Sequence, residues 1–294
     1  MTTRQPASDH RVFDVGVPQP QRLPLVFASP HSGSNYPADF VARSLLDPVA
    51  LRKSEDSYVD EIFAAAPRLG APLIRALYPR AYADPNREPY ELDPRMFEEV
   101  LPDWVNIASP RIAAGLGTIA RVVANGAEIY GIKLSFKEAV ERIERCYRPY
   151  HHTLGGLIRE TRQRFGRCVL VDCHSMPSIG GPMERDAGEP RVDVVLGDCF
   201  GASCSEGVMI AAERAFRRLG YSVARNVPYA GGYTTRHYGR PEEGVHALQI
   251  EINRALYMDE ATMARKAHLA RLVREMESVI LALGAADEMT RAAE

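Results

Sequence analysis

The sequence lacks the features that mark several specialised classes of protein. Its five cysteines are an odd number without a CxxC pair, which favours reduced thiols over a disulfide framework. No stretch approaches the roughly 18 consecutive apolar residues that a membrane helix needs, and the opening residues MTTRQPASDHRVF contain no apolar signal region. We therefore expect a cytoplasmic protein without a membrane partner.

The sequence also has no large excess of positive or negative charge. The 36 lysines and arginines are balanced by 38 aspartates and glutamates, and the formal net charge is -2. No basic block with interleaved aromatic residues is present, so we expect no nucleic-acid partner. Because internal repeats and an evident linker are absent, residues 1–294 are predicted to form a single domain, with 1–20 as an extended N-terminal segment. We expect a monomer or a small homo-oligomer.

Apolar runs of strand character alternate along the chain with segments of helical periodicity. Strands are predicted at 23–29, 71–77, 118–123, 192–198, 221–227 and 246–253, and another opens the stretch VLVDCHSMPS at 169–178. Helices are predicted at 48–69, 135–165, 205–219 and 259–284, and Pro149 and Gly155-Gly156 are expected to kink or divide the second. This alternation predicts an α/β fold of three layers, α/β/α, with a mixed central sheet.

Two histidines stand where predicted strands end. The buried strand that opens VLVDCHSMPS finishes in polar residues and presents His174, and the strand at 23–29 runs into SPHSGSNYP and presents His31. Imidazoles on rigid backbone suit a zinc site with a carboxylate as third ligand and water in the fourth position. We expect structural roles for His10, His151, His152 and His268, whereas His237 and His246 could contact a substrate.

The third ligand must come from another segment. The best source is SEDSYVDEIF, in the predicted helix at 48–69, where Asp56 and Asp60 are four residues apart and so share a helix face. We prefer Asp56 as the metal ligand and keep Asp60 as the alternative. The competing interpretation is that both belong to a solvated helix face.

A glutamate lies within the strand predicted at 246–253. Alternation places Leu248, Ile250 and Ile252 on one face of this strand. The other face carries Gln249, Glu251 and Asn253, which indicates a polar cavity. Glu251 is therefore a candidate general base that takes a proton from water and returns it to a leaving nitrogen. The alternative is a buried glutamate paired with Arg254 or another arginine.

Two loops offer substrate-binding side chains. RAYADPNREPYELDP contains Asn86 and Arg87, and the planar fork of an arginine beside an asparagine suits a carboxylate. PYAGGYTTRHYGRP, at 228–241, contains Tyr233 and Arg236 in a glycine-rich loop that could close over a polar ligand. An ordinary surface loop is the alternative for the second segment.

Four blocks occur in order over nearly the whole chain: PHSGSNYP, ADPNREPYELDP, DCHSMPS and GGYTTRHYGRPEEGVHALQIEINRALYMDE. Together they resemble the N-formylglutamate amidohydrolase (N-formylglutamate deformylase) family, and the last block is the most specific. The resemblance implies a phosphorylase/hydrolase-like fold similar to that of the zinc carboxypeptidases. It also implies hydrolysis of the formyl amide of N-formyl-L-glutamate late in histidine degradation.

The wider resemblance to the carboxypeptidase clan implies roles for particular residues. His31 and His174 would bind zinc, Asn86 and Arg87 would bind a substrate carboxylate, and Glu251 would be the general base. As a separate hypothesis about the mechanism, an arginine such as Arg236 would help to stabilise the oxyanion, and Tyr233 would help to complete the substrate pocket. The carboxypeptidases place an acidic ligand three residues after the first histidine, but Ser34 occupies that position here. The carboxylate must then come from the later segment, with Asp56.

Three other functions remain open from the sequence. The same zinc chemistry could act on another N-acyl amino acid or a short peptide. A serine hydrolase could use Ser175 or Ser32, although neither lies in a GxSxG elbow. A non-catalytic amino-acid-binding protein could use the same scaffold.

Overall fold

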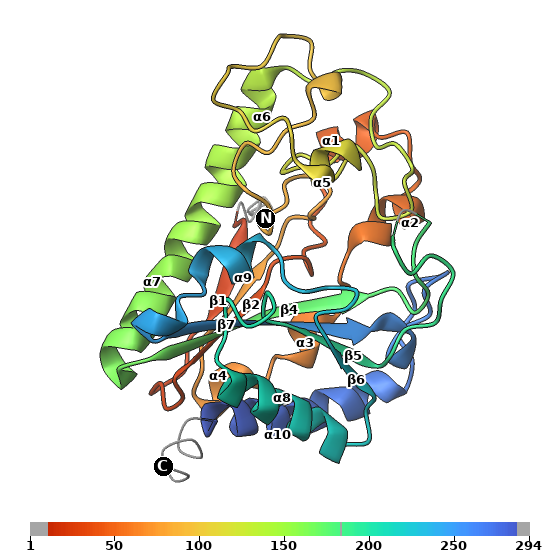
Figure 1. The fold of residues 1–294 in the computed structure, drawn as a ribbon. Helices are drawn as coiled ribbons and strands as arrows, with labels where there is room; N and C mark the ends of the chain where they lie inside the picture. The colour runs from red at the N-terminus through yellow and green to blue at the C-terminus, as the bar shows by residue number, and fades with distance from the viewer. Residues whose placement is uncertain (1–10, 183, 287–294) are drawn as a thin grey trace, which may run out of the picture.

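A mixed sheet of seven strands crosses the molecule in a computed structural model that describes residues 11–182 and 184–286 (Figure 1). Its strands are β1 (Phe13–Gly16), β2 (Leu25–Ser29), β3 (Leu73–Ala76), β4 (Cys168–Met176), β5 (Val194–Gly197), β6 (Val223–Arg225) and β7 (Val245–Asn253). They lie in the order β1-β3-β2-β4-β7-β5-β6. β3, β2, β4 and β7 are parallel, whereas β1 and β5 are each antiparallel to their neighbour in this group. The predicted mixed sheet is confirmed.

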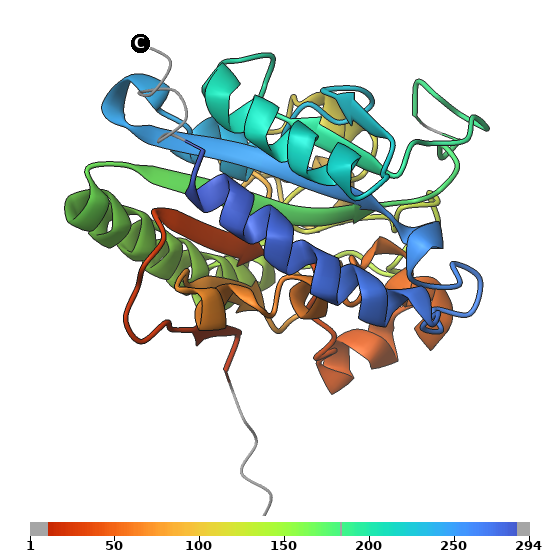
Figure 2. The same ribbon diagram turned by 90° about the horizontal axis from the view of Figure 1, so that it is seen from below.

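Helices cover both faces of this sheet (Figures 1 and 2). One face packs against α3 (Val59–Ile62), α4 (Ala66–Leu69), α8 (Glu206–Arg218) and α10 (His268–Gly284). On the other lie α6 (Phe136–Arg142), α7 (Arg148–Phe165) and α9 (Tyr233–Tyr238), joined by loops that carry α1 (Ala38–Arg43), α2 (Pro48–Leu51) and α5 (Pro110–Ala113). Short turns complete the structure: η1 (Arg52–Ser54), η2 (Pro94–Met96), η3 (Ile143–Tyr147), η4 (Pro241–Glu243) and η5 (Arg254–Leu256). The three-layer α/β/α prediction is confirmed.

The alternation of side chains along β4 explains where polar groups enter the core. Val169, Val171 and Cys173 pack in the hydrophobic cluster beneath α8 and α10. Leu170 faces the opposite cluster, which includes residues of α7. Because successive side chains alternate, the polar residues that follow at 172 and 174 extend this second face. A polar site therefore begins on the α7 side of the sheet, toward the carboxyl end of β4.

The continuous helix predicted at 48–69 is wrong. This segment divides into α2, η1, α3 and α4, and Asp56 lies in the irregular stretch before α3. Tyr58 adopts a left-handed conformation with φ 68°, which a regular helix cannot accommodate. The backbone N–H of Asp56 donates instead to the carbonyl of His31 at 3.0 Å. The break therefore attaches this segment to the end of β2.

Three further element predictions differ from the structure. No strand forms at 118–123; Val122 makes an isolated bridge with Glu128, while the buried side chains enter the core from irregular backbone. The last helix begins at His268 rather than 259, because Met263 adopts a left-handed conformation with φ 62°, which ends the turn that follows Asp259. The stretch at 135–165 begins at Ser135, whose hydroxyl accepts the Glu138 N–H, and it divides at the π-helical turn η3, whereas α7 continues through Pro149 and Gly155-Gly156.

The N-terminal segment contributes a strand to the edge of the sheet. β1 lies within the N-terminal segment predicted to be extended and pairs antiparallel with β3. His10 lies outside the described residues. Among the helices that the structure describes, none combines the length and apolar character needed to cross a bilayer.

Candidate functional site

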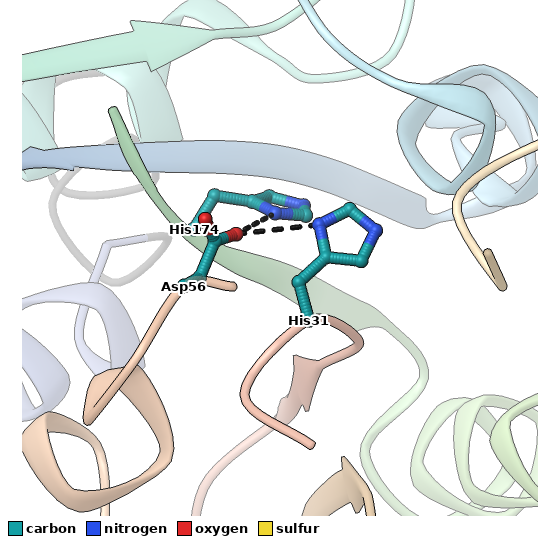
Figure 3. A group of neighbouring side chains, drawn as sticks. All are labelled: His31, Asp56 and His174. Carbon is teal, nitrogen blue, oxygen red and sulfur yellow. Dashed lines mark hydrogen bonds and ion pairs between the residues drawn. The ribbon is translucent and has the colours of Figure 1, made fainter. Parts of the chain in front are cut away.

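Three predicted ligands converge at the carboxyl ends of β2 and β4 (Figure 3). His31 follows β2, His174 lies in β4, and Asp56 lies in the break before α3. The Asp56 Oδ2 atom is 3.3 Å from Nδ1 of His31 and 3.0 Å from Nδ1 of His174. The structure therefore brings together three side chains that are far apart in the sequence.

Asp60 points elsewhere. It lies in α3, where its Oδ2 atom accepts a hydrogen bond from Arg75 at 2.9 Å. Its backbone N–H donates to the Ser32 hydroxyl at 3.1 Å. Between the two aspartates considered from the sequence, the geometry favours Asp56 as a partner of the histidines.

The outer nitrogens of both histidines face further carboxylates. Nε2 of His31 is 2.7 Å from Asp84, and Nε2 of His174 is 3.0 Å from Asp172. Asn86 donates its amide to Asp172 at 3.2 Å and lies 3.0 Å from the same His174 nitrogen. Carboxylates in these positions hold the proton on Nε2 and leave the Nδ1 lone pair available as a metal ligand.

The inner atoms fit a zinc ion in spacing and chemistry. The ligand atoms of His31, Asp56 and His174 all lie within 4.8 Å of one another. A tetrahedral zinc with bonds of about 2.0–2.1 Å separates its ligand atoms by about 3.3 Å. The two histidine–carboxylate distances, 3.3 and 3.0 Å, are close to that value. Two imidazoles and a carboxylate also leave one tetrahedral position open, as catalytic zinc sites do.

Electrostatics keep the Asp56 carboxylate ionised. Burial alone would raise its pKa, but the imidazoles of His174 and His31 that face its Oδ2 atom hold that pKa well below its usual range. Although burial opposes a charged imidazole, Asp172 and Asp56 raise the pKa of His174 well above 6.5. In the metal-free protein a proton on His174 thus balances the carboxylates, and a metal cation would displace it.

The second oxygen of Asp56 is also fully engaged. Oδ1 accepts from Arg254 Nη2 at 3.0 Å and from the Ser175 hydroxyl at 3.2 Å. Arg254 Nε donates to the Ser175 Oγ atom at 3.1 Å. Ser175 therefore donates its proton to a carboxylate that is already ionised and held by a guanidinium. These contacts do not activate the serine as a nucleophile.

Glu251 lies beside the histidine–aspartate cluster. It pairs in register with His174 across β4 and β7, and its carboxylate accepts a hydrogen bond from Gln249 at 3.0 Å. Arg254 binds Asp56 rather than Glu251, so the ion pair considered as an alternative from the sequence does not form. Burial raises the pKa of Glu251 to about 7, with a further increase from Asp56 and a decrease from His174.

A cavity of about 440 Å³ opens onto these groups. Asn86 and Arg87 line it, together with the three candidate metal ligands and Glu251. Arg87 directs Nε to the Leu116 carbonyl at 2.8 Å and Nη1 to the Asn86 carbonyl at 2.9 Å. Burial lowers the pKa of Arg87 to about 10, so the guanidinium stays charged at neutral pH. The cavity is large enough for a small ligand.

Tyr233 and Arg236 lie next to the cavity rather than in its wall. Both belong to α9; the Tyr233 hydroxyl lies 3.1 Å from His237, and Arg236 donates to the Gly231 carbonyl. The paired glycines before α9 line the cavity instead. A Cβ atom on Gly232 would lie 2.4 Å from the Asn86 amide nitrogen, so the close approach of this loop requires glycine.

Four further residues belong to the site although the sequence did not predict them there: Asp84, Asp172, Arg80 and Arg254. Asp84 accepts two hydrogen bonds from Arg80, at 2.7 and 3.1 Å, and this cation lowers its pKa against the effect of burial. A signal existed for Asp172, which stands two residues before His174 in DCH and so shares its strand face. Arg80 stands four residues before its partner Asp84, whereas Asp56, the partner of Arg254, is distant in the sequence, so no local signal marks Arg254.

Four of the other described histidines make contacts outside the candidate metal cluster, and the fifth, His152, is exposed on α7. His151 contacts the Tyr238 hydroxyl and the Pro85 carbonyl, at 2.9 and 2.7 Å, as expected for a structural residue. His268 lies 3.3 Å from the Tyr221 hydroxyl. His246 is buried near the start of β7, where Nδ1 accepts from the Ser205 N–H, and His237 is exposed on α9.

Comparisons with known proteins show which family this chain resembles over most of its length. The family model described as N-formylglutamate amidohydrolase matches residues 23–258. An N-formylglutamate deformylase of Pseudomonas aeruginosa is 32% identical over 278 residues, which cover 90% of this chain and 94% of that protein. One from Pseudomonas putida is 31% identical over 245 residues, 81% of this chain and 83% of the relative.

A solved structure gives the same result. The crystal structure of N-formylglutamate amidohydrolase from Ralstonia eutropha JMP134 superposes with a TM-score of 0.84 at 39% identity. The superposition covers 96% of this chain and 99% of that one. The fold and the sequence therefore match over nearly the same extent of chain.

The geometry predicts that Asp56 and Asp60 differ in metal binding. Asp56→Asn should weaken Zn²⁺ binding at least about tenfold, because it removes the charged oxygen that faces both histidines. Asp60→Asn is the matched control and should bind Zn²⁺ as the wild type does. Calorimetric titration of the chelated proteins with Zn²⁺ measures both constants. Equal affinities in the two variants would contradict the assignment.

The raised pKa of Glu251 predicts a pH-dependent stability in the metal-free protein. Folding favours the protonated carboxyl, so this stabilisation is present below pH 4.5 and is lost as pH rises through about 7. Glu251→Gln removes the cost of ionisation, and its advantage over the wild type should grow by about 3 kcal/mol between pH 4.5 and pH 8. Urea unfolding at both pH values measures this difference, with the exposed variant Glu243→Gln as the control. An advantage that stays constant with pH would refute the prediction.

Proposed function

Because this chain belongs to the N-formylglutamate amidohydrolase family, we propose that it is a zinc-dependent enzyme that hydrolyses the formyl amide of N-formyl-L-glutamate to formate and L-glutamate. The observation that carries the proposal is the convergence of His31, Asp56 and His174 beside the buried Glu251 in one cavity. The comparisons support the substrate, since the relatives are named for N-formylglutamate. As the family resemblance implies, we expect a cytoplasmic role in histidine degradation.

Nδ1 of His31, Nδ1 of His174 and Oδ2 of Asp56 would hold the zinc ion. When bound there, zinc supplies a Lewis acid that polarises a carbonyl and lowers the pKa of water toward about 7. Asp84 and Asp172 orient the two imidazoles through their Nε2 atoms. These outer carboxylates also raise the basicity of the ligands.

Glu251 moves the proton in the proposed reaction. Its carboxylate takes a proton from the attacking water and later delivers it to the leaving amine nitrogen, so that formate and the amino acid separate. A pKa of about 7 suits both directions of transfer at neutral pH. Gln249 fixes the carboxylate through its hydrogen bond.

We assign substrate binding to the Arg87 guanidinium and the Asn86 amide, which line the cavity. Arg87 and Asn86 would bind a carboxylate of the amino acid. The position of Asn86 is fixed because its oxygen accepts the Thr234 N–H at 2.8 Å while its amide contacts Asp172. Arg236 and Tyr233, on the adjoining α9, keep their proposed roles at the edge of the substrate site.

Two alternative functions would use the same cavity. Another N-acyl amino acid would satisfy the same proton transfer and the same carboxylate contact. A non-catalytic amino-acid-binding protein would need no metal and no proton donor near neutrality. The paired presence of the metal-ligand geometry and Glu251 therefore favours the enzyme.

The first experiment measures formate released from N-formyl-L-glutamate before chelation, after chelation and after zinc return. We expect release that chelation abolishes and zinc restores, with about one zinc per chain in the active protein. N-acetyl-L-glutamate serves as the comparison for the acyl group. Metal-bound protein that releases no formate would move the substrate to another acyl group, and release that resists complete metal removal would contradict the zinc assignment.

A second prediction concerns the general base. Glu251→Gln keeps the size of the side chain but cannot accept the proton, so kcat should fall at least about 100-fold. Zinc content should stay at the wild-type level, because Glu251 is not among the proposed ligands. Glu243→Gln, on the exposed turn η4, should retain wild-type turnover. Near-normal kcat in Glu251→Gln would exclude its role as the base.

A further inference from the structure

Four arginines line the cavity, and they differ in how their guanidinium groups are used: Arg80, Arg87, Arg111 and Arg254. Arg80 binds Asp84, and Arg254 binds Asp56 and Ser175. Arg87 donates to two backbone carbonyls and approaches Asp84 at 3.8 Å. Arg111 makes no hydrogen bond or ion pair with its side chain among the residues that the structure describes. Its five N–H donors are therefore available to a ligand.

The place of Arg111 is fixed by its local structure. It lies in α5, which begins when the Ser109 hydroxyl accepts the backbone N–H of Ile112 at 3.1 Å. The guanidinium is half-buried at the cavity, and the nearest charge on α9 is another cation, Arg236. Burial and that neighbouring cation lower the pKa of Arg111. An anion bound here would relieve the repulsion between the two arginines.

The part of the cavity wall formed by the residues after Arg111 in the sequence is apolar. This part of the cavity is formed by small and aliphatic residues: Ala114, Leu116, Gly117, Ala120, Val122 and Ala124. Such a surface suits methylene groups, whereas a guanidinium at its start suits a terminal carboxylate. An aliphatic chain that ends in a carboxylate matches both features.

We infer that Arg111 binds the side-chain carboxylate of an acidic N-formyl amino acid and is the residue that selects acidic over neutral substrates. The inference rests on the proposed function for the reaction at the formyl group. It divides the two carboxylates of the substrate between two arginines, with Arg87 beside Asn86 for the α-carboxylate and Arg111 for the side chain. Charge is then matched at both ends of the bound amino acid.

The kinetic test compares N-formyl-L-glutamate with N-formyl-L-glutamine, which has nearly the same shape but a neutral side chain. Arg111→Gln should lower kcat/KM for the glutamate compound at least about 30-fold and change that for the glutamine compound less than about threefold, as expected for the loss of a charge-assisted hydrogen bond. Arg111→Lys should recover part of the loss. Arg214→Gln, exposed on α8, is the control and should keep the wild-type ratio. Equal losses on both compounds would overturn the inference.

A binding measurement separates this inference from the proposed reaction. Calorimetric titration with L-glutamate and L-glutamine needs no turnover. The wild type should bind L-glutamate more tightly than L-glutamine, and Arg111→Gln should remove that preference. If this result is obtained from a protein that releases no formate, the proposed reaction is wrong and the role of Arg111 stands. A wild type without the preference would overturn the role of Arg111 whatever the turnover.

Discussion

The buried carboxylate of Asp56 is the interaction on which the site depends. One oxygen faces both histidines, and the other accepts from Ser175 and Arg254. An ionised carboxylate in the interior is costly unless such partners replace its water. Its contacts join the end of β2, the break before α3, the strand β4 and the turn after β7. The carboxylate thereby fixes the relative positions of four segments, and the ligand geometry follows from that constraint.

The sheet makes this polar network possible. β4 and β7 are parallel neighbours in register, so Asp172 lies beside Gln249 and His174 lies beside Glu251. All four side chains project from the same face, while the alternate positions pack into the cluster under α8 and α10. The apolar face holds the strands rigidly, and rigid strands hold charged groups at fixed distances. Packing on one side of the sheet thus supports chemistry on the other.

The local pattern predicted the sheet and much of the site, because strand alternation and strand ends are local properties. It placed His31 and His174 correctly at the ends of β2 and β4, and Glu251 on the polar face of β7. It failed at the segment around Asp56, where amphipathic spacing suggested a helix. The left-handed Tyr58 and the hydrogen bond to the His31 carbonyl determine that segment, and both depend on the folded surroundings. Arg254 was missed because its partner Asp56 is distant in the sequence, and Arg111 because only the folded cavity defines its place. The spacing of Arg80 and Asp84 is local, but it does not show that Asp84 lies against His31.

Two carboxylates in the same cavity acquire opposite properties from their neighbours. Asp56 is surrounded by two imidazoles and the Arg254 guanidinium, so its pKa lies well below its usual range and it stays ionised, as its proposed role in metal binding requires. Glu251 has one neutral hydrogen-bond donor, Gln249, and burial raises its pKa to about 7. If Arg254 paired with Glu251 instead, the pKa of Glu251 would fall, and the carboxylate would stay ionised and could not act as the proposed proton carrier. Because Arg254 pairs with Asp56, the proposed metal ligand stays ionised while the proposed base can still change its protonation state.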